Sequence, residues 1–206
     1  MLKYLIPQFP LRDLPVILGF SAVGSLIAGV YGIVHDQLTY TIGPEYFTHF
    51  KFDQFSWANL HLGDRFFVAC IGFLATWWIG LIVAWILTRR MLPNQSRPVA
   101  YRKVVAGFVI VFVIGLIFGI SGYAYGSYRG PQGDYSAWQG NFEQLGISDK
   151  WSFMKVAYIH NAGYLGGLVG LIMTYFLIRP DKSVSDDAKT RRGEASVTGS
   201  SRRRFA

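Results

Sequence analysis

The chain has 206 residues, of which 51% are hydrophobic and 17% aromatic, and this composition is too apolar for a typical small soluble domain. Its formal net charge is +8, which on its own could suggest a nucleic-acid-binding protein. That class is excluded by where the charges fall. The segments predicted below to face the cytoplasm hold 15 of the 20 Lys and Arg but only 5 of the 12 Asp and Glu.

Four apolar stretches are long enough to cross a bilayer as helices, which takes about 20 residues. None of them contains Asp, Glu, Lys or Arg, and they run from about 14–34, 66–88, 104–124 and 156–178. Four such helices could be buried in a soluble protein only if a large surrounding structure covered them. The 206 residues are too few to supply such a structure. The sequence therefore predicts an all-α fold, an integral membrane four-helix bundle that forms a single transmembrane domain over residues 1–179.

The distribution of basic residues predicts the orientation of this bundle. Cytoplasmic segments of membrane proteins are enriched in Lys and Arg, so both termini are expected in the cytoplasm, with the bacterial cytoplasmic membrane as the expected location. The basic inner segments are expected to contact anionic lipid head groups. Residues 180–206 are polar and basic, and are predicted to be a disordered cytoplasmic tail.

The two halves of the chain carry matching segments at a constant offset of about 90 residues. Residues 26–32, 52–55 and 80–89 correspond to 116–122, 142–145 and 170–179. This indicates a tandem repeat, with repeat one at about 14–89 and repeat two at about 104–179. Two spans return the chain to its starting side, so the repeats should be parallel and related by an axis along the membrane normal.

Each repeat also contributes a long outer loop, at residues 35–65 and 125–155. Both loops are rich in Tyr, Phe and Trp and carry a Gly-Pro pair, so they are expected to fold against the membrane face rather than remain unstructured. Residues 45–55 are predicted to form a short interfacial helix. The only cysteine, Cys70, lies within the second span, so no intramolecular disulfide can hold these loops.

Small residues recur every four positions in the spans. Such spacing allows close backbone approach, which is the main source of helix packing in lipid. The stripes favour packing within the bundle, and the alternative is a homodimer through one of them. They include Gly24, Ala28 and Gly32; Gly72, Thr76 and Gly80; Gly115 and Gly119; and Gly166 and Gly170.

Two histidines occur at the outer ends of spans, at similar depth. His35 follows the first span beside Asp36, and His160 lies near the start of the fourth. Polar groups at this depth are often functional, and the bundle could bring them together to hold a divalent metal or haem, with Asp36 as a supporting or additional ligand. The commoner role of such histidines is hydrogen bonding at the interface. His49 and His61, in the first outer loop, are predicted to be solvated.

A second candidate site comes from the repeat itself. Asp53 and Gln54 correspond to Glu143 and Gln144, an acid followed by an amide between apolar residues. These side chains could satisfy local backbone donors, or they could line an outer vestibule that binds a cation, a polar ligand or a partner. Asn161 is the most polar neutral residue within the spans and joins this candidate set.

No catalytic motif is present, so the sequence favours a non-enzymatic scaffold, assembly or sensing component that acts through its outer loops. The first alternative is a small-solute or ion transporter or channel working as an oligomer. The second is a haem- or metal-binding protein that uses His35 and His160. The expected partners are the bilayer and either a membrane protein or further copies of the chain, and no cofactor is required by the pattern.

Overall fold

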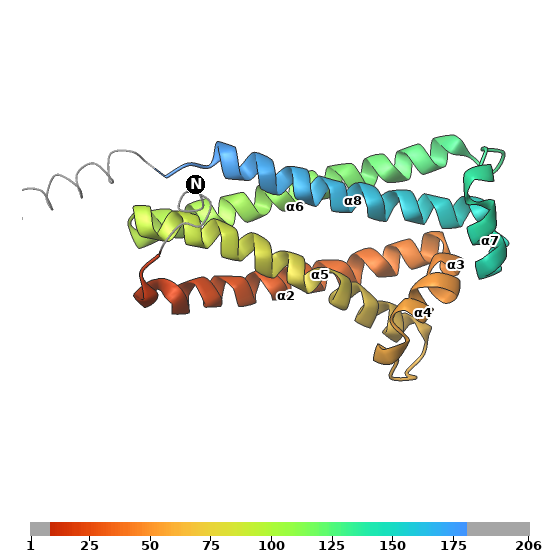
Figure 1. Cartoon of the computed structure of the whole chain (residues 1–206), viewed down its shortest axis with the longest axis horizontal. Coiled ribbons are helices and arrows are strands. Elements are labelled where there is room, and N and C mark those ends of the chain that lie inside the picture. The colour runs from red at the N-terminus through yellow and green to blue at the C-terminus, as the bar shows by residue number, and fades with distance from the viewer. Residues whose placement is uncertain (1–8, 181–206) are drawn as a thin grey trace, which may run out of the picture.

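The computed structural model describes residues 9–180, and this part of the chain is helical with no strand. Within it, four helices are long and apolar enough to cross a membrane (Figure 1). They are α2 (Leu14–Ile42), α5 (Asp64–Met91), α6 (Arg97–Arg129) and α8 (Lys150–Leu177). The four long apolar helices that the sequence predicts are therefore confirmed, although each helix begins before its apolar stretch or ends after it.

Short helical elements join the long helices. Between α2 and α5 the chain forms an almost continuous helical segment, which confirms the short helix predicted at residues 45–55. The short elements are η1 (Leu11–Asp13), α3 (Pro44–Tyr46), η2 (Phe47–Lys51), α4 (Phe52–Gln54), η3 (Ser56–Ala58), η4 (Leu92–Asn94), η5 (Ser136–Trp138) and α7 (Gln139–Leu145).

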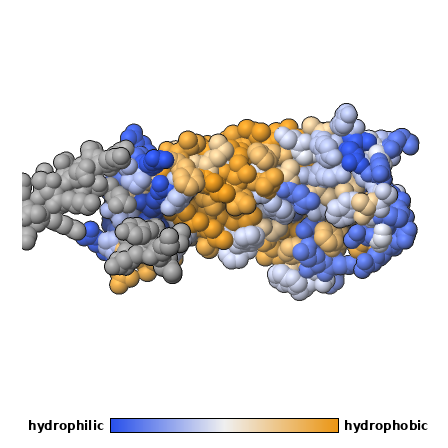
Figure 2. All heavy atoms as spheres, turned by 45° about the horizontal axis from the view of Figure 1, so that its top comes forward, coloured by the Kyte–Doolittle hydropathy of each residue, from blue (hydrophilic) through white to orange (hydrophobic). Residues whose placement is uncertain are grey.

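The bundle has two hydrophilic ends. We call the end that carries α3, α4 and α7 the loop end, and the end that carries η4 the connector end (Figure 1). An apolar band lies between hydrophilic surfaces at these two ends (Figure 2). This is the surface expected of a protein whose central part contacts lipid and whose ends contact water and head groups.

The long helices pack mainly as two pairs, α2 against α5 and α6 against α8. Glycines make the first pair possible, because a Cβ atom added to Gly32 would lie 2.0 Å from the carbonyl oxygen of Gly72. A Cβ on Gly24 would lie 2.7 Å from the carbonyl oxygen of Gly80. The predicted packing of small residues within the chain is thus observed along α2 and α5.

The described residues form hydrophobic clusters at both ends of the bundle. At the loop end, Phe47 and Phe142 are fully buried with residues of α8. At the connector end, Ile17 and Leu87 pack with the start of α6. These clusters join the two helix pairs at their ends, and the site described below lies between them.

Residues 1–8 and 181–206 lie outside the described residues, so the predicted basic tail is almost entirely outside them. The positions of the membrane and of the termini relative to it stay predictions.

Candidate functional site

His35, Asp36 and His160 come together between α2 and α8 toward the loop end. Asp36 lies at the centre, with its Oδ1 atom 3.0 Å from Nδ1 of His35 and 3.2 Å from Nε2 of His160. The two imidazole rings meet edge to face, 4.8 Å apart between centroids. One potential ligand atom from each of the three residues lies within 4.8 Å of the other two.

The local structure follows from the length of α2. The helix does not end at the predicted limit near residue 34 but continues for two more turns, to Ile42. This extension places Asp36 inside a helix and against α8, rather than in an outer loop. His160 lies in the third turn of α8, which begins earlier than its apolar stretch.

A backbone carbonyl determines the protonation of His160. Its Nδ1 lies 3.0 Å from the carbonyl oxygen of Val156, which can only accept a hydrogen bond, so Nδ1 carries a proton. The Nε2 atom, which faces Asp36, is then the free ligand atom of the neutral ring. A histidine held by a carbonyl on one nitrogen and offering the other is the usual arrangement at a metal site.

Without a metal ion, the same contact requires an additional proton. Nε2 of neutral His160 and the Asp36 carboxylate would both be acceptors at 3.2 Å, so either the ring is an imidazolium or the carboxyl is protonated. A metal ion between them would remove this conflict, because both atoms are electron-pair donors.

The cluster is deeply buried. Asp36 and His160 are each 4% exposed, and such burial of a carboxylate requires a partner. Tyr46 stacks on the His160 ring at 5.0 Å between centroids, and Tyr31 lies 5.5 Å from His35. These rings restrict the orientation of both imidazoles, and His35, unlike the other two residues, is partly exposed.

The spacing of the ligand atoms suits a small divalent ion. Two bonds of about 2.1 Å that meet at a tetrahedral angle place their ligand atoms about 3.4 Å apart. The two separations from Asp36, 3.0 and 3.2 Å, are close to this value. The ligand atoms of the two histidines lie within 4.8 Å of each other, so His35 and His160 would have to move closer together to share one ion. Haem fits less well, because a porphyrin plane would have to pass between two imidazoles that are in contact.

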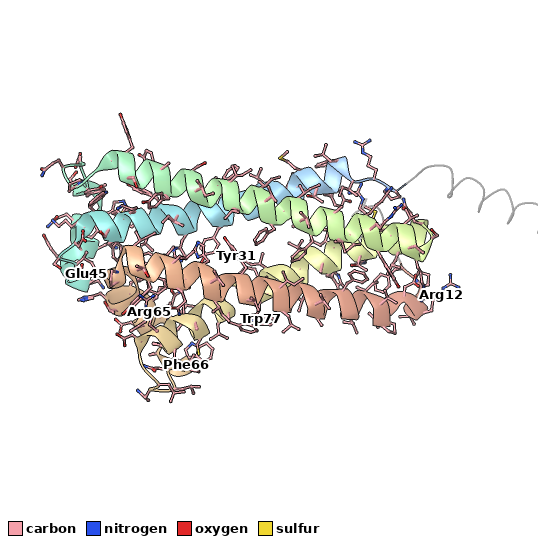
Figure 3. The ribbon with its side chains drawn as sticks, turned by 180° about the vertical axis from the view of Figure 1, so that it is seen from behind. Arg12, Tyr31, Glu45, Arg65, Phe66 and Trp77 are labelled. Atoms are coloured by element: carbon pink, nitrogen blue, oxygen red, sulfur yellow. The ribbon has the colours of Figure 1, made fainter. Side chains whose placement is uncertain are left out.

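A cavity of about 830 Å³ opens beside the cluster. It lies between the two helix pairs, and all four long helices contribute to its walls, which are predominantly apolar. His35, Asp36 and His160 all border it. Tyr31 projects from α2 into the space between the pairs (Figure 3) and its ring lies 5.0 Å from that of Phe112 on α6.

Lys51 adds a positive charge to the loop end of the cavity. Its Nζ donates a hydrogen bond to Oε1 of Gln54, 3.0 Å away, and lies 5.1 to 5.8 Å from the ring centroids of Tyr46, Phe50 and Phe55. Burial lowers the pKa of the Lys51 ammonium, and the negative charge of Asp36 acts in the opposite direction. No carboxylate among residues 9–180 forms an ion pair with it.

The second set of predicted site residues does not form a buried cluster. Gln54 borders the cavity and binds Lys51, but Asp53 is exposed. Glu143 is also exposed and accepts a hydrogen bond from Gln139, and Gln144 and Asn161 are exposed as well.

The remaining histidines lie outside the cluster. His49 and His61 are exposed, as predicted, and Nδ1 of His49 donates to the carbonyl oxygen of Leu145 at 2.8 Å. Sequence reasoning did not select Tyr31 or Lys51. Tyr31 could have been found, because it lies one helical turn before His35 and so shares its face. Lys51 could not, because its approach to the cavity depends on the fold of the loop.

No protein-family model matches the chain, and neither the curated proteins nor the solved structures include a match.

Proposed function

We propose that this protein is a multi-pass membrane protein that binds a divalent transition-metal ion through His35, Asp36 and His160. The observation that carries the proposal is the convergence of these three side chains, from two helices distant in sequence, around the buried carboxylate of Asp36. Imidazole nitrogens with one carboxylate oxygen form a ligand set typical of zinc and related ions.

The surroundings suggest what the ion would do. Structural zinc sites are closed by four protein ligands, whereas functional sites keep a position open for water or another ligand. Here the protein offers three ligands, and all three border the cavity. The open position of the ion would thus be reached from the cavity.

We therefore place metal binding, the second alternative from the sequence, ahead of the scaffold and transporter functions. The scaffold and transporter hypotheses relied on the outer loops and on Asp53 and Glu143, whose side chains are exposed at the loop end. The metal hypothesis relied on His35 and His160 meeting in space, and their distances support it.

In this proposal the loop end faces the outside of a bacterial cytoplasmic membrane and both termini face the cytoplasm. The excess of Lys and Arg in the connector between α5 and α6 supports this orientation. The pairing of α2 with α5 and of α6 with α8 supports a tandem two-helix repeat, because each pair corresponds to one half of the chain.

The test is elemental analysis of the purified protein after incubation with Zn²⁺ and removal of loosely bound ions. We expect about one zinc ion per chain, and a loss of at least about tenfold in affinity in His160→Ala and Asp36→Asn. Asn has nearly the same shape as Asp, so Asp36→Asn still tests the metal ligand if His160→Ala fails to fold.

His49→Ala is the matched control, because His49 is exposed and is not part of the cluster. It should retain the zinc of the wild type. A wild-type protein that retains no zinc, or a folded Asp36→Asn protein that retains as much as His49→Ala, would falsify the proposal.

A further inference from the structure

The cavity beside the candidate metal-binding cluster has the size of a small-molecule site. Its volume of about 830 Å³ falls within the range of roughly 300–1,000 Å³ typical of small-molecule sites. Such sites are mostly apolar with a few convergent polar groups, and this description fits the cavity well. Its polar groups gather at the end nearest the loops.

Glycines keep the cavity open. Gly163 and Gly167 on α8 border it, and a Cβ atom added to either would meet nothing within 4 Å. In contrast, Gly166 on the same helix packs against α6 so closely that a Cβ would lie 2.5 Å from Phe118. One face of α8 thus packs tightly against α6, whereas the adjacent face borders the cavity.

The cavity is also elongated along the bundle. From His160 to Leu171, both of which border it, α8 advances about 16 Å, close to the length of an extended alkyl chain of roughly a dozen carbons. The walls along this length are apolar, with Ile79 and Val83 on α5 and Phe108 and Val111 on α6.

The charges at the polar end favour an anion. Lys51 is held over three aromatic rings, which stabilise its positive charge, and it has no carboxylate partner within residues 9–180. When a divalent ion is bound, its charge and that of Lys51 outweigh the single carboxylate of Asp36. An incoming carboxylate would compensate this excess and could complete the coordination of the ion.

We infer that the cavity binds a long-chain carboxylic acid, with its carboxylate between Lys51 and the metal ion and its alkyl chain along the apolar walls toward Leu171. The inference rests on the proposed function for the metal, and adds to it the class of ligand that reaches the open position. A single-chain acid is favoured over a phospholipid because, among residues 9–180, Lys51 is the one cationic side chain that borders the cavity.

The test is the binding of dodecanoic acid to the zinc-loaded, full-length protein in nanodiscs, with bound zinc measured in the same samples. We expect saturable binding of about one acid per chain, and at least tenfold weaker binding of dodecanol, which has the same chain but no charge. Lys51→Gln should weaken the binding of the acid more than that of the alcohol.

Gly167→Leu should weaken binding strongly because its side chain would obstruct the cavity between His160 and Leu171, and it should leave zinc bound because Gly167 is not a ligand. The matched control is Gly19→Leu, since Gly19 is an exposed helical glycine that also has nothing within 4 Å of its added Cβ and does not border the cavity. Equal binding of the acid by these two variants would overturn the inference.

The outcomes separate the two proposals. If zinc binds and dodecanoic acid does not, the inference fails and the proposed function stands. If zinc does not bind, the proposed function itself fails. If the wild type retains one phospholipid per chain and Gly167→Leu does not, the occupant of the cavity is a membrane lipid. If the wild type is a dimer and Gly167→Leu is not, the occupant is a second copy of the chain. Either result overturns the inference.

Discussion

At the scale of single residues, Asp36 is the centre of the candidate site. It is a buried carboxylate in a helix that crosses the apolar part of the molecule, and two imidazoles contact the same oxygen atom. Leaving such a charge without partners costs several kcal/mol, so its neighbours are needed both for folding and for any ion it binds.

Replacing a histidine beside Asp36 should therefore reduce stability as well as metal binding. We expect His160→Ala to lower the free energy of unfolding by about 3 kcal/mol in the absence of metal, because it leaves the carboxylate with one partner fewer. Thermal unfolding in detergent, compared with His61→Ala at an exposed position, would measure this. An equal melting temperature for the two variants would show that His160 does not stabilise Asp36.

Glu45 provides a different residue-scale test, at the loop end. Its carboxylate accepts hydrogen bonds from the backbone amides of Ser148 and Asp149, each at 2.9 Å, and from the Ser148 hydroxyl. Burial alone would raise the pKa of Glu45, but these hydrogen bonds hold it below the ordinary value of 4.5. The ionised form thus ties α3 to the start of α8.

The consequence is a pH-dependent contribution to stability. Because the pKa of Glu45 is lowered by folding, its stabilisation is present above pH 4.5 and is lost as the pH falls through the folded-state value. We expect Glu45→Gln to melt below the wild type at pH 7, with a difference that shrinks as the pH is lowered below 4.5. The contribution should be below about 1 kcal/mol, because the group is largely solvated.

Glu143→Gln is the control for this pH series, because Glu143 is exposed and accepts its hydrogen bond from a neighbouring side chain on α7. A difference between wild type and Glu45→Gln that stayed constant from pH 7 to pH 3 would contradict the assignment.

At the scale of elements, close approach of glycines sets the geometry of the α2–α5 pair. Gly32 and Gly72 meet with their backbones in contact, so neither position has space for a methyl group. Without the hydrophobic effect to join helices in lipid, this contact is a principal source of their association.

We accordingly expect Gly32→Ala to destabilise the protein by about 1–3 kcal/mol through overpacking. Gly19→Ala on the same helix should be neutral or slightly stabilising, because it has open space and alanine favours a helix. Melting temperatures of the two proteins in one detergent provide the comparison. Similar values for both would contradict the packing described here.

The helices themselves could be predicted from the sequence, but their ends could not. Long apolar runs without charges predict long helices, and all four are present with the length and composition that a membrane span needs. The last turns of α2 contain Asp36, Gln37 and Thr39, which read as the start of a loop. They are helical because α8 supplies a partner for Asp36, and the hydroxyl of Thr39 bonds the preceding turn at His35.

The candidate site was only partly predictable for a related reason. The similar depth of His35 and His160 could be inferred from their positions in the spans. That they face one another depends on the rotation of α2 and α8 about their axes, which hydropathy does not fix. The repeat offered no help, since its offset places Tyr125, not a histidine, opposite His35.

At the scale of the whole molecule, the two helix pairs meet at hydrophobic clusters near both ends and separate between them. This arrangement produces the cavity and places its polar end beneath the short helices of the loop end. If the loop end faces outward, the metal-binding cluster lies within the outer half of the bilayer.

This orientation can be tested with single cysteines in a Cys70→Ser background. A membrane-impermeant maleimide applied to intact spheroplasts should label Ala137→Cys, at the loop end, but not Ser96→Cys, beside the start of α6. Both positions are exposed, and neither side chain is needed for packing. Labelling of Ser96→Cys without permeabilisation would reverse the predicted topology.

X-ray absorption spectroscopy at the zinc edge of the zinc-loaded protein tests directly whether His35, Asp36 and His160 bind the ion. We expect nitrogen and oxygen ligands at about 2.0–2.2 Å, with outer scattering from two imidazoles that weakens in His160→Ala. A zinc spectrum without imidazole scattering, or one unchanged in His160→Ala, would show that His35, Asp36 and His160 do not form the metal site.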